Sequence, residues 1–236
     1  MDNIQTRATL DEHLKGIMDD IIRLSSKVDT AIDKAINAFA ACDVELAQEV
    51  IAEDVHINTK RFELEEHCLH IMVTQQPVAV DLRLIIATMN IVTELERIGD
   101  YAAGIAKLAV RVEMVPKRDI PNAVYQLTSQ CRDMLRRAMV AYTEHDANLA
   151  YAVADNDDSL DTQHRMLFHK LVGETRDASQ STDYLLSVLF VAHNIERIGD
   201  RATNIAERVI FMALSLIHIS EPTRPRLISY AVFCLK

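Results

Sequence analysis

The chain has 236 residues, with 25 Lys and Arg against 35 Asp and Glu, which gives a formal net charge of −10 at pH 7. A charge of this sign argues against a nucleic-acid-binding protein, because such proteins neutralise phosphates with a basic face. Only five Gly and five Pro occur and 49% of the residues are hydrophobic, so helices are favoured over sheets and a sizeable core can be buried.

Apolar residues recur with a period of about 3.6 residues between the proline-containing breaks, and this pattern predicts six long helices. The residues from Thr9 to Glu12 form a capping-box pattern, which predicts the start of the first helix. The predicted ranges are 9–40, 43–74, 78–113, 120–144, 146–176 and 182–213. Long helices with short connections are typical of helical bundles, so the predicted fold is all-α.

Two segments of the first half recur in the second half. DVELAQEVIAEDVHIN (residues 43–58) resembles DANLAYAVADNDDSLD (residues 146–161), and TELERIGDYAAGIA (residues 93–106) resembles HNIERIGDRATNIA (residues 193–206). Duplication is the simplest explanation of two ordered matches at nearly the same spacing. We therefore expect two tandem, pseudo-symmetric three-helix bundles, in residues 1–115 and 116–213.

The repeated motif ERIGD places two carboxylates four residues apart, on one face of a helix, in each half. The preceding helix of each half has the same spacing, with Asp54 and Asn58 in the first half and Asp157 and Asp161 in the second. Oxygen side chains that face one another across a bundle can chelate Mg, Mn, Fe or Zn. The alternative is that each acid is a solvated residue paired with an arginine of its own helix.

Repetition of these acidic stripes at equivalent positions favours metal binding over the ion-pair alternative. Gly99 and Gly199 stand just before the second acid of each motif, where a glycine costs a helix about 1 kcal/mol relative to alanine. We expect the missing side chain to admit a neighbouring helix or a bulky ion cluster beside the acids.

A metal-storage or metalloenzyme bundle is one alternative, and a metal-free structural scaffold is another. Ferritin-like di-iron proteins place Glu-x-x-His on two helices, and we expect no Glu-x-x-His in this chain; the nearest spacing, Asp161-x-x-His164, has no counterpart in the first half. No nucleophilic triad and no glycine-rich phosphate loop is apparent, which predicts that the protein is not an enzyme. Other histidines lack partners at ligand spacing and are expected to be structural or exposed: His67, His70, His169 and His193.

The segments DLRLIIATMNIVTELERIGDYAAGIAK and NIERIGDRATNIAERV resemble the paired signature of the PhoU family of bacterial phosphate-signalling accessory proteins. The likeness extends from about Thr6 to Ala213. It implies two tandem three-helix bundles that carry iron, zinc or manganese clusters on E/D-x-x-x-D motifs. The metal ligands that it implies are Glu96, Asp100, Glu196, Asp200, Asn204, Asp54, Asn58, Asp157 and Asp161. The first half has Gly104 where the second has Asn204, so the first cluster is expected to be weaker or smaller.

The function implied by this resemblance is regulatory. Members of the family repress the phosphate-starvation response and restrain phosphate uptake, with the phosphate ABC transporter ATPase and the membrane sensor histidine kinase as partners, and form homodimers or larger oligomers. The residues themselves show no signal peptide and no apolar run of membrane length, and the four cysteines are scattered. We therefore expect a cytoplasmic protein that reaches the inner membrane only through its partners.

The last segment, LSLIHISEPTRPRLISYAVFCLK (residues 214–236), has no counterpart in the repeat. Its back-translation spells a transposase-type sequencing adapter followed by the flow-cell end of the same adapter. We predict that these residues are translated adapter rather than native sequence, and segments of this kind are excluded from reasoning about the fold. The alternative is a natural C-terminal extension.

Overall fold

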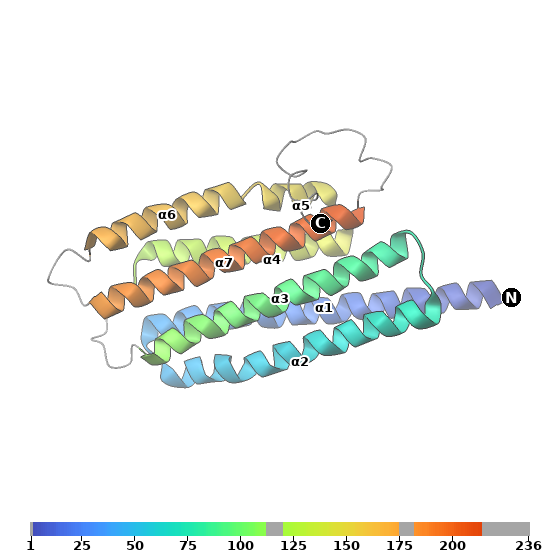
Figure 1. The fold of residues 1–236 in the computed structure, drawn as a ribbon, viewed down its shortest axis with the longest axis horizontal. Coiled ribbons are helices and arrows are strands. Elements are labelled where there is room, and N and C mark those ends of the chain that lie inside the picture. The colour runs from blue at the N-terminus through green and yellow to red at the C-terminus, as the bar shows by residue number, and fades with distance from the viewer. Residues whose placement is uncertain (1, 112–119, 175–181, 214–236) are drawn as a thin grey trace, which may run out of the picture.

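The computed structural model describes residues 2–111, 120–174 and 182–213. Seven helices occur in these ranges: α1 (Asp2–Ala41), α2 (Val44–Gln75), α3 (Val80–Arg111), α4 (Asn122–Glu144), α5 (Ala147–Ala154), α6 (Asp157–Glu174) and α7 (Thr182–Ala213). Helices α1 to α3 form one bundle, and α4 to α7 form a second bundle beside it (Figure 1). The prediction of an all-α fold with tandem bundles is confirmed. The predicted boundary near residue 115 and the suspected adapter lie outside the described residues.

Two of the predicted helix ranges were wrong, whereas those of α2, α3, α4 and α7 match closely. The first helix begins at Asp2, so Thr9 lies inside α1 and does not cap its start. Residues 2–8 contain no glycine or proline that would end a helix. Arg7 pairs with Asp11 of the same helix at 3.0 Å and with Asp81 at the start of α3 at 2.6 Å, which fixes this extension to the bundle.

The helix predicted for residues 146–176 is divided between α5 and α6. Asp155 and Asn156 form a turn between Ala154 and Asp157, because the side chains in the sequence DNDD compete with the backbone for its hydrogen bonds. The break places Asp157 in the first turn of α6. The α5 and α6 segments together take the place in the second bundle that α2 takes in the first (Figure 1).

Equivalent turns lead into the second helix of each bundle, α2 and α5. Cys42 (φ 52°) and His145 (φ 54°) adopt the left-handed conformation that ends the preceding helix. Asp43 then caps α2 by accepting from the N–H of Leu46, and Asp146 caps α5 by accepting from the N–H groups of two residues in its first turn. The duplicated sequence therefore folds into duplicated local structure.

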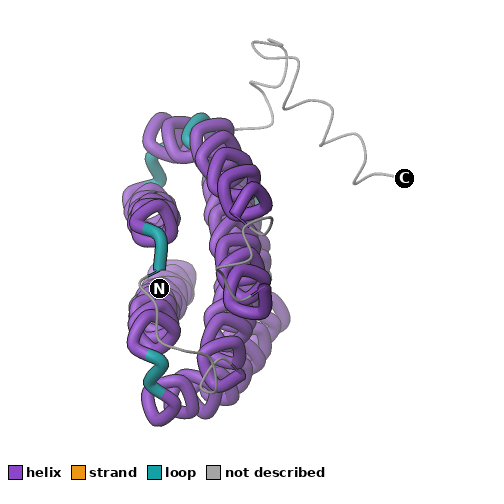
Figure 2. The backbone as a smooth tube through the Cα atoms, turned by 90° about the vertical axis from the view of Figure 1, so that its left-hand side faces the viewer, coloured by secondary structure: helices purple, strands orange, loops and turns teal. Residues whose placement is uncertain are grey.

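Helices α3 and α7 lie at the centre of the molecule and run side by side in opposite directions (Figure 1). Their contacts join the two bundles, together with an ion-pair network in which Arg132 and Arg136 of α4 reach Asp29 of α1 at 2.8 Å each. A view along the helices shows that the cross-section is elongated (Figure 2). Almost all of the core side chains are aliphatic. None of the described helices has the length and apolar content needed to cross a membrane.

Candidate metal centre

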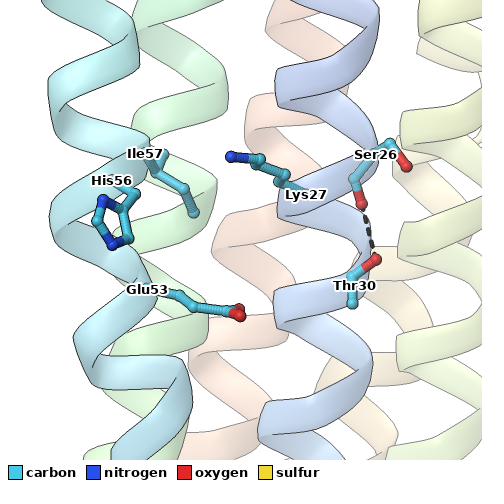
Figure 3. Close-up of a pocket in the computed structure, with 6 residues that line it drawn as sticks. All are labelled: Ser26, Lys27, Thr30, Glu53, His56 and Ile57. Atoms are coloured by element: carbon cyan, nitrogen blue, oxygen red, sulfur yellow. Dashed lines mark hydrogen bonds between the residues drawn. The ribbon is translucent and has the colours of Figure 1, made fainter.

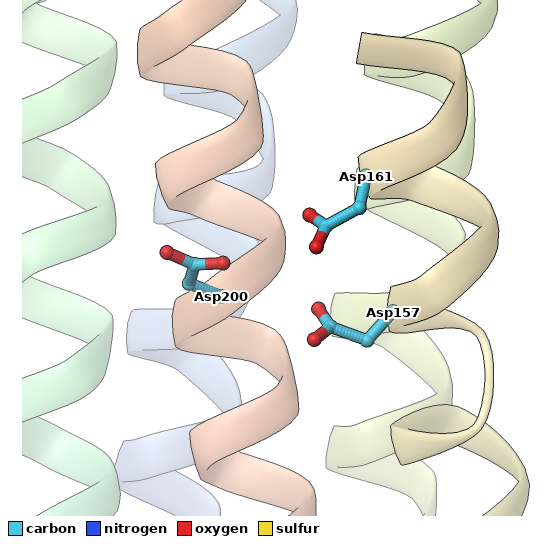
Figure 4. Close-up of side chains that lie close together, drawn as sticks. All are labelled: Asp157, Asp161 and Asp200. Atoms are coloured by element: carbon cyan, nitrogen blue, oxygen red, sulfur yellow. The ribbon is translucent and has the colours of Figure 1, made fainter. Parts of the chain in front are cut away.

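Three carboxylates of the second bundle face one another across the contact between α6 and α7 (Figure 4). Asp157 and Asp161 lie one turn apart on α6, and Asp200 lies opposite them on α7. One oxygen of each residue lies within 4.8 Å of those of the other two. Oxygen ligands lie about 2.0–2.6 Å from a bound cation and hence up to about 5 Å from one another, so this spacing suits a single cation. We call these residues the acidic triad.

The absence of a side chain at Gly199 allows α6 to approach α7 at the acidic triad. A Cβ at this position would overlap Cδ2 of Leu160, which lies between Asp157 and Asp161 along α6. The first bundle shows the same relationship in a looser form, because a Cβ at Gly99 would lie 3.1 Å from Cδ1 of Ile57. The expectation that each glycine admits a neighbouring helix beside the acids is confirmed.

The environment of the acidic triad disfavours a negative charge. Burial, followed by the neighbouring acids, raises the pKa of Asp157, although a hydrogen bond of 3.1 Å from the Thr203 hydroxyl to its Oδ1 opposes the shift. Burial and the neighbouring Glu196 carboxylate raise the pKa of Asp200, against the opposing effect of Arg197. A cation among these oxygens would relieve both the desolvation and the mutual repulsion.

Glu196 lies beside the acidic triad rather than within it. Its Oε2 is 3.0 Å from Arg197 Nε, and the same guanidinium reaches Asp200 at 3.0 Å through Nη1. The ion pairs of the alternative interpretation therefore do occur at the second motif. Glu196 Oε2 is nevertheless buried and accepts no well-aligned hydrogen bond from the described residues. Glu196 also lines a groove of about 210 Å³ with Asp161 and His164, which gives the triad an open side.

Asn204 is turned toward the other bundle. Its Nδ2 donates to Glu94 Oε2 of α3 at 3.2 Å, and Arg201 Nη1 lies 3.2 Å from the same oxygen. The equivalent position in the first half, Gly104, faces Asn194, and a Cβ there would lie 3.4 Å from Asn194 Nδ2. Glu94 and Asn194 are themselves equivalent in the repeat. The difference between Gly104 and Asn204 thus falls at the α3–α7 interface, and Asn204 as a metal ligand stays a prediction.

The first bundle brings together the equivalent residues of α2 and α3. Asn58 Nδ2 donates to Asp54 Oδ2 at 3.4 Å, and Glu96 Oε1 lies 3.5 Å from Arg61 Nη1. Burial and then the Asp100 carboxylate raise the pKa of both Asp54 and Glu96. Asp54 Oδ1 is buried and has no hydrogen-bond partner among the described residues. In the first bundle, the amide of Asn58 therefore occupies the position that the carboxylate of Asp161 has in the second bundle.

The expectation that the chain contains no Glu-x-x-His was wrong. Glu53 and His56 form a single Glu-x-x-His on α2, which a direct scan of the sequence finds. Both residues line a groove of about 220 Å³ between α1 and α2 (Figure 3), and Glu53 Oε1 lies 3.2 Å from Lys34 Nζ. No second Glu-x-x-His occurs in the chain, so the paired arrangement of ferritin-like proteins is absent.

Comparisons with known proteins agree with this architecture. A family model described as PhoU domain matches residues 21–109 and residues 124–209. The chain is 31% identical over 208 residues to a "Phosphate-specific transport system accessory protein PhoU homolog" of Clostridium acetobutylicum, with 88% of this chain and 95% of that protein covered. It is 34% identical over 202 residues to a protein of the same description from Pseudomonas putida, with 84% and 78% covered.

Two solved structures are also similar. The crystal structure of PhoU from Pseudomonas aeruginosa superimposes with a TM-score of 0.81 at 32% identity, covering 86% of this chain and 97% of that chain. The phosphate transport system regulatory protein PhoU from Streptococcus pneumoniae gives a TM-score of 0.81 at 27% identity, covering 88% and 100%. The similarity therefore extends over both bundles.

Proposed function

This chain belongs to the PhoU family, and on that premise we propose that it represses the phosphate-starvation response and restrains phosphate uptake. The observation that carries the proposal is the family match over both bundles, residues 21–109 and 124–209. The family consists of regulatory proteins rather than enzymes, as the sequence predicted. Relatives named as accessory or regulatory proteins of phosphate transport support this choice.

The proposed partners are the phosphate ABC transporter ATPase and the membrane sensor histidine kinase, which the protein would bridge from the cytoplasm. An acidic chain with a net charge of −10 suits docking to basic partner surfaces. The outer face of α2 carries an exposed apolar stripe, since the side chains of Val55, Phe62, Leu69 and Val73 are more than half exposed. A stripe of this kind supports assembly with another protein or a second copy of this chain.

The acidic clusters are proposed to hold iron, zinc or manganese. Asp157, Asp161 and Asp200 would provide the ligands of the second site, with Glu196 at its open side. The donor set fits hard or borderline cations. When bound, the metal would supply positive charge that offsets the repulsion among these acids, and the carboxylates of α6 and α7 that ligate it would hold the two helices together.

The equivalent site of the first bundle would use Asp54, Asn58, Glu96 and Asp100. The buried Asp54 Oδ1 without a hydrogen-bond partner among the described residues supports a ligand at this position, since buried carboxylate oxygens are normally satisfied. Asn204 remains a proposed additional ligand of the second site, to be tested against its observed bond to Glu94.

A pull-down from cells grown with and without phosphate tests the regulatory proposal. The tagged wild type is compared with a variant in which Glu96, Asp100, Glu196 and Asp200 are replaced by Ala, and metal content is measured in both. We expect the wild type to capture the transporter ATPase and to contain metal, and the variant to lose both.

The control for this experiment changes four exposed acids outside the sites, Glu12 and Asp19 of α1 and Glu45 and Glu66 of α2, to Ala. It should behave as wild type, which separates loss of the sites from a general loss of negative charge. Retention of both metal and transporter by the fourfold variant would overturn the proposed role of the acidic motifs.

A further inference from the structure

Three histidines from two helices gather on the surface of the first bundle. The ring centroid of His13 on α1 lies 5.7 Å from that of His67 and 6.5 Å from that of His70, both on α2. His13 and His67 are half-buried, and His70 is exposed. His67 and His70 were expected to lack partners at ligand spacing, whereas the packing of α1 on α2 brings His13 beside both. We call these residues the histidine cluster.

One pair of the histidine cluster has nearly the spacing of a tetrahedral metal site, and the third ring reaches it by rotation of an exposed side chain. Imidazole nitrogens lie 2.0–2.1 Å from zinc, so the ring centroids of two histidines on one ion are about 5 Å apart. The pair His13–His67 is within about 1 Å of this value at 5.7 Å. His70 lies three residues after His67, on the same face of α2, and its exposure allows the ring to rotate toward His13.

The surface of α1 beside the histidine cluster is open, and two other potential ligands of the region, Asp20 and Cys68, are engaged elsewhere. A Cβ at Gly16, three residues after His13, would meet no atom within 4 Å, so the surface of α1 is open there. Asp20, the next acid along α1 on this side, is held by Lys60 at 3.1 Å. Cys68 is buried with an exposed fraction of 1%, among the side chains of the core.

We propose that His13, His67 and His70 form a binding site for one Zn²⁺ ion or a related borderline cation, with water completing the coordination. Three imidazoles select zinc, nickel or copper over magnesium and calcium, so this site differs in chemistry from the oxygen ligands of the acidic triad. Its ligands come from both α1 and α2, so a bound ion fastens these two helices to each other.

The test uses the metal-free protein in which Asp54→Asn, Asp100→Asn, Asp157→Asn and Asp200→Asn remove the acidic sites of both bundles. Zinc binding is measured by calorimetry, and Co²⁺ is used as a spectroscopic probe, because tetrahedral cobalt absorbs strongly in the visible range. We expect one equivalent of zinc to bind, and each of His13→Gln, His67→Gln and His70→Gln to weaken binding on the order of 100-fold. The tetrahedral cobalt spectrum should disappear with the same substitutions.

His169→Gln is the matched control, because His169 is an exposed histidine of α6, in the other bundle. It should leave zinc affinity and the cobalt spectrum unchanged. The proposal would be overturned if the three cluster variants bound zinc as tightly as the protein without histidine substitutions. It would also be overturned if His169→Gln weakened zinc binding as much as they do. Either result would leave the cluster as ring packing alone. His70→Gln keeps the test decisive if the half-buried His13 or His67 variants fold poorly, since an exposed side chain can be replaced without disturbing the core.

Discussion

The side chain of Leu160 on α6 fills the space in which a Cβ of Gly199 on α7 would lie. Because Leu160 stands between Asp157 and Asp161 in the sequence, this contact also fixes how closely those two acids approach Asp200. The glycine of the ERIGD motif is therefore a packing residue, and its effect on the carboxylates is geometric.

Substitution of this glycine should separate packing from helix propensity. Gly199→Ala is expected to destabilise the protein by about 1–3 kcal/mol, because overpacking against Leu160 outweighs the gain of about 1 kcal/mol in propensity. Gly99→Ala should cost less, since Ile57 lies 3.1 Å from the added Cβ. Urea unfolding measures both. Gly16→Ala, which meets nothing within 4 Å, is the control and should stabilise; a stabilising Gly199→Ala would contradict the packing argument.

The acidic triad predicts a pH dependence of the metal-free protein. The pKa values of Asp157 and Asp200 are raised by burial, so the folded state binds more protons than the unfolded state as these groups titrate. Their contribution to stability is therefore greatest at low pH and declines as the pH rises from the ordinary carboxyl value of 3.8 through the raised folded values.

Asp200→Asn tests this linkage directly. In the metal-free protein it should raise the free energy of unfolding at pH 7 by roughly 0.5 kcal/mol, about 1–2 °C in Tm, because it removes like-charge repulsion. It should also reduce the rise in Tm that manganese produces in the wild type, because the second acidic site is lost while that of the first bundle remains. Thermal scans with and without metal measure both effects. The idea fails if the variant is less stable without metal and its Tm still rises with manganese as much as that of the wild type.

Arg197 offers a means to distinguish the ion-pair and metal interpretations. Its guanidinium lies 3.0 Å from both Glu196 and Asp200 and so competes with a cation for the same oxygens. Arg197→Gln is expected to increase metal affinity about 2–5-fold, by removing a pair worth up to about 1 kcal/mol. Calorimetric titration measures the change, with Arg23→Gln on α1 as a charge-matched control. Unchanged or weaker metal binding would favour the ion-pair interpretation.

The α3–α7 interface should depend on Glu94. This half-buried carboxylate accepts from Asn204 and pairs with Arg201, each at 3.2 Å. Glu94→Gln is expected to cost about 1–3 kcal/mol, because it leaves the Arg201 guanidinium poorly compensated. A double-mutant cycle with Asn204→Ala, measured by urea unfolding, should give a coupling of about 0.5–1.5 kcal/mol. Additive effects would show that the bond between the bundles contributes nothing measurable.

The helical fold could be predicted because its determinants are local. The 3.6-residue periodicity, the scarcity of glycine and proline, and the duplicated segments are all properties of short stretches, and they predicted two three-helix bundles. The prediction that the capping box at Thr9 starts the first helix was wrong. No residue before Thr9 ends a helix, and Arg7 forms an ion pair with Asp81 of another helix. The break at Asp155 was missed because a strong apolar periodicity on either side concealed it.

The candidate site was only half determined by the sequence. An i,i+4 spacing fixes which residues share one face of a helix, so the acidic stripes of α6 and α7 followed from the motifs alone. Which side chains meet across two helices depends on how closely and in what rotation the helices pack. Tertiary packing placed Asp200 against Asp157 and Asp161, turned Asn204 to Glu94 and brought His13 to His67. Those contacts depend on residues far apart in the sequence, such as Leu160 and Gly199, and therefore cannot be predicted from a local sequence pattern.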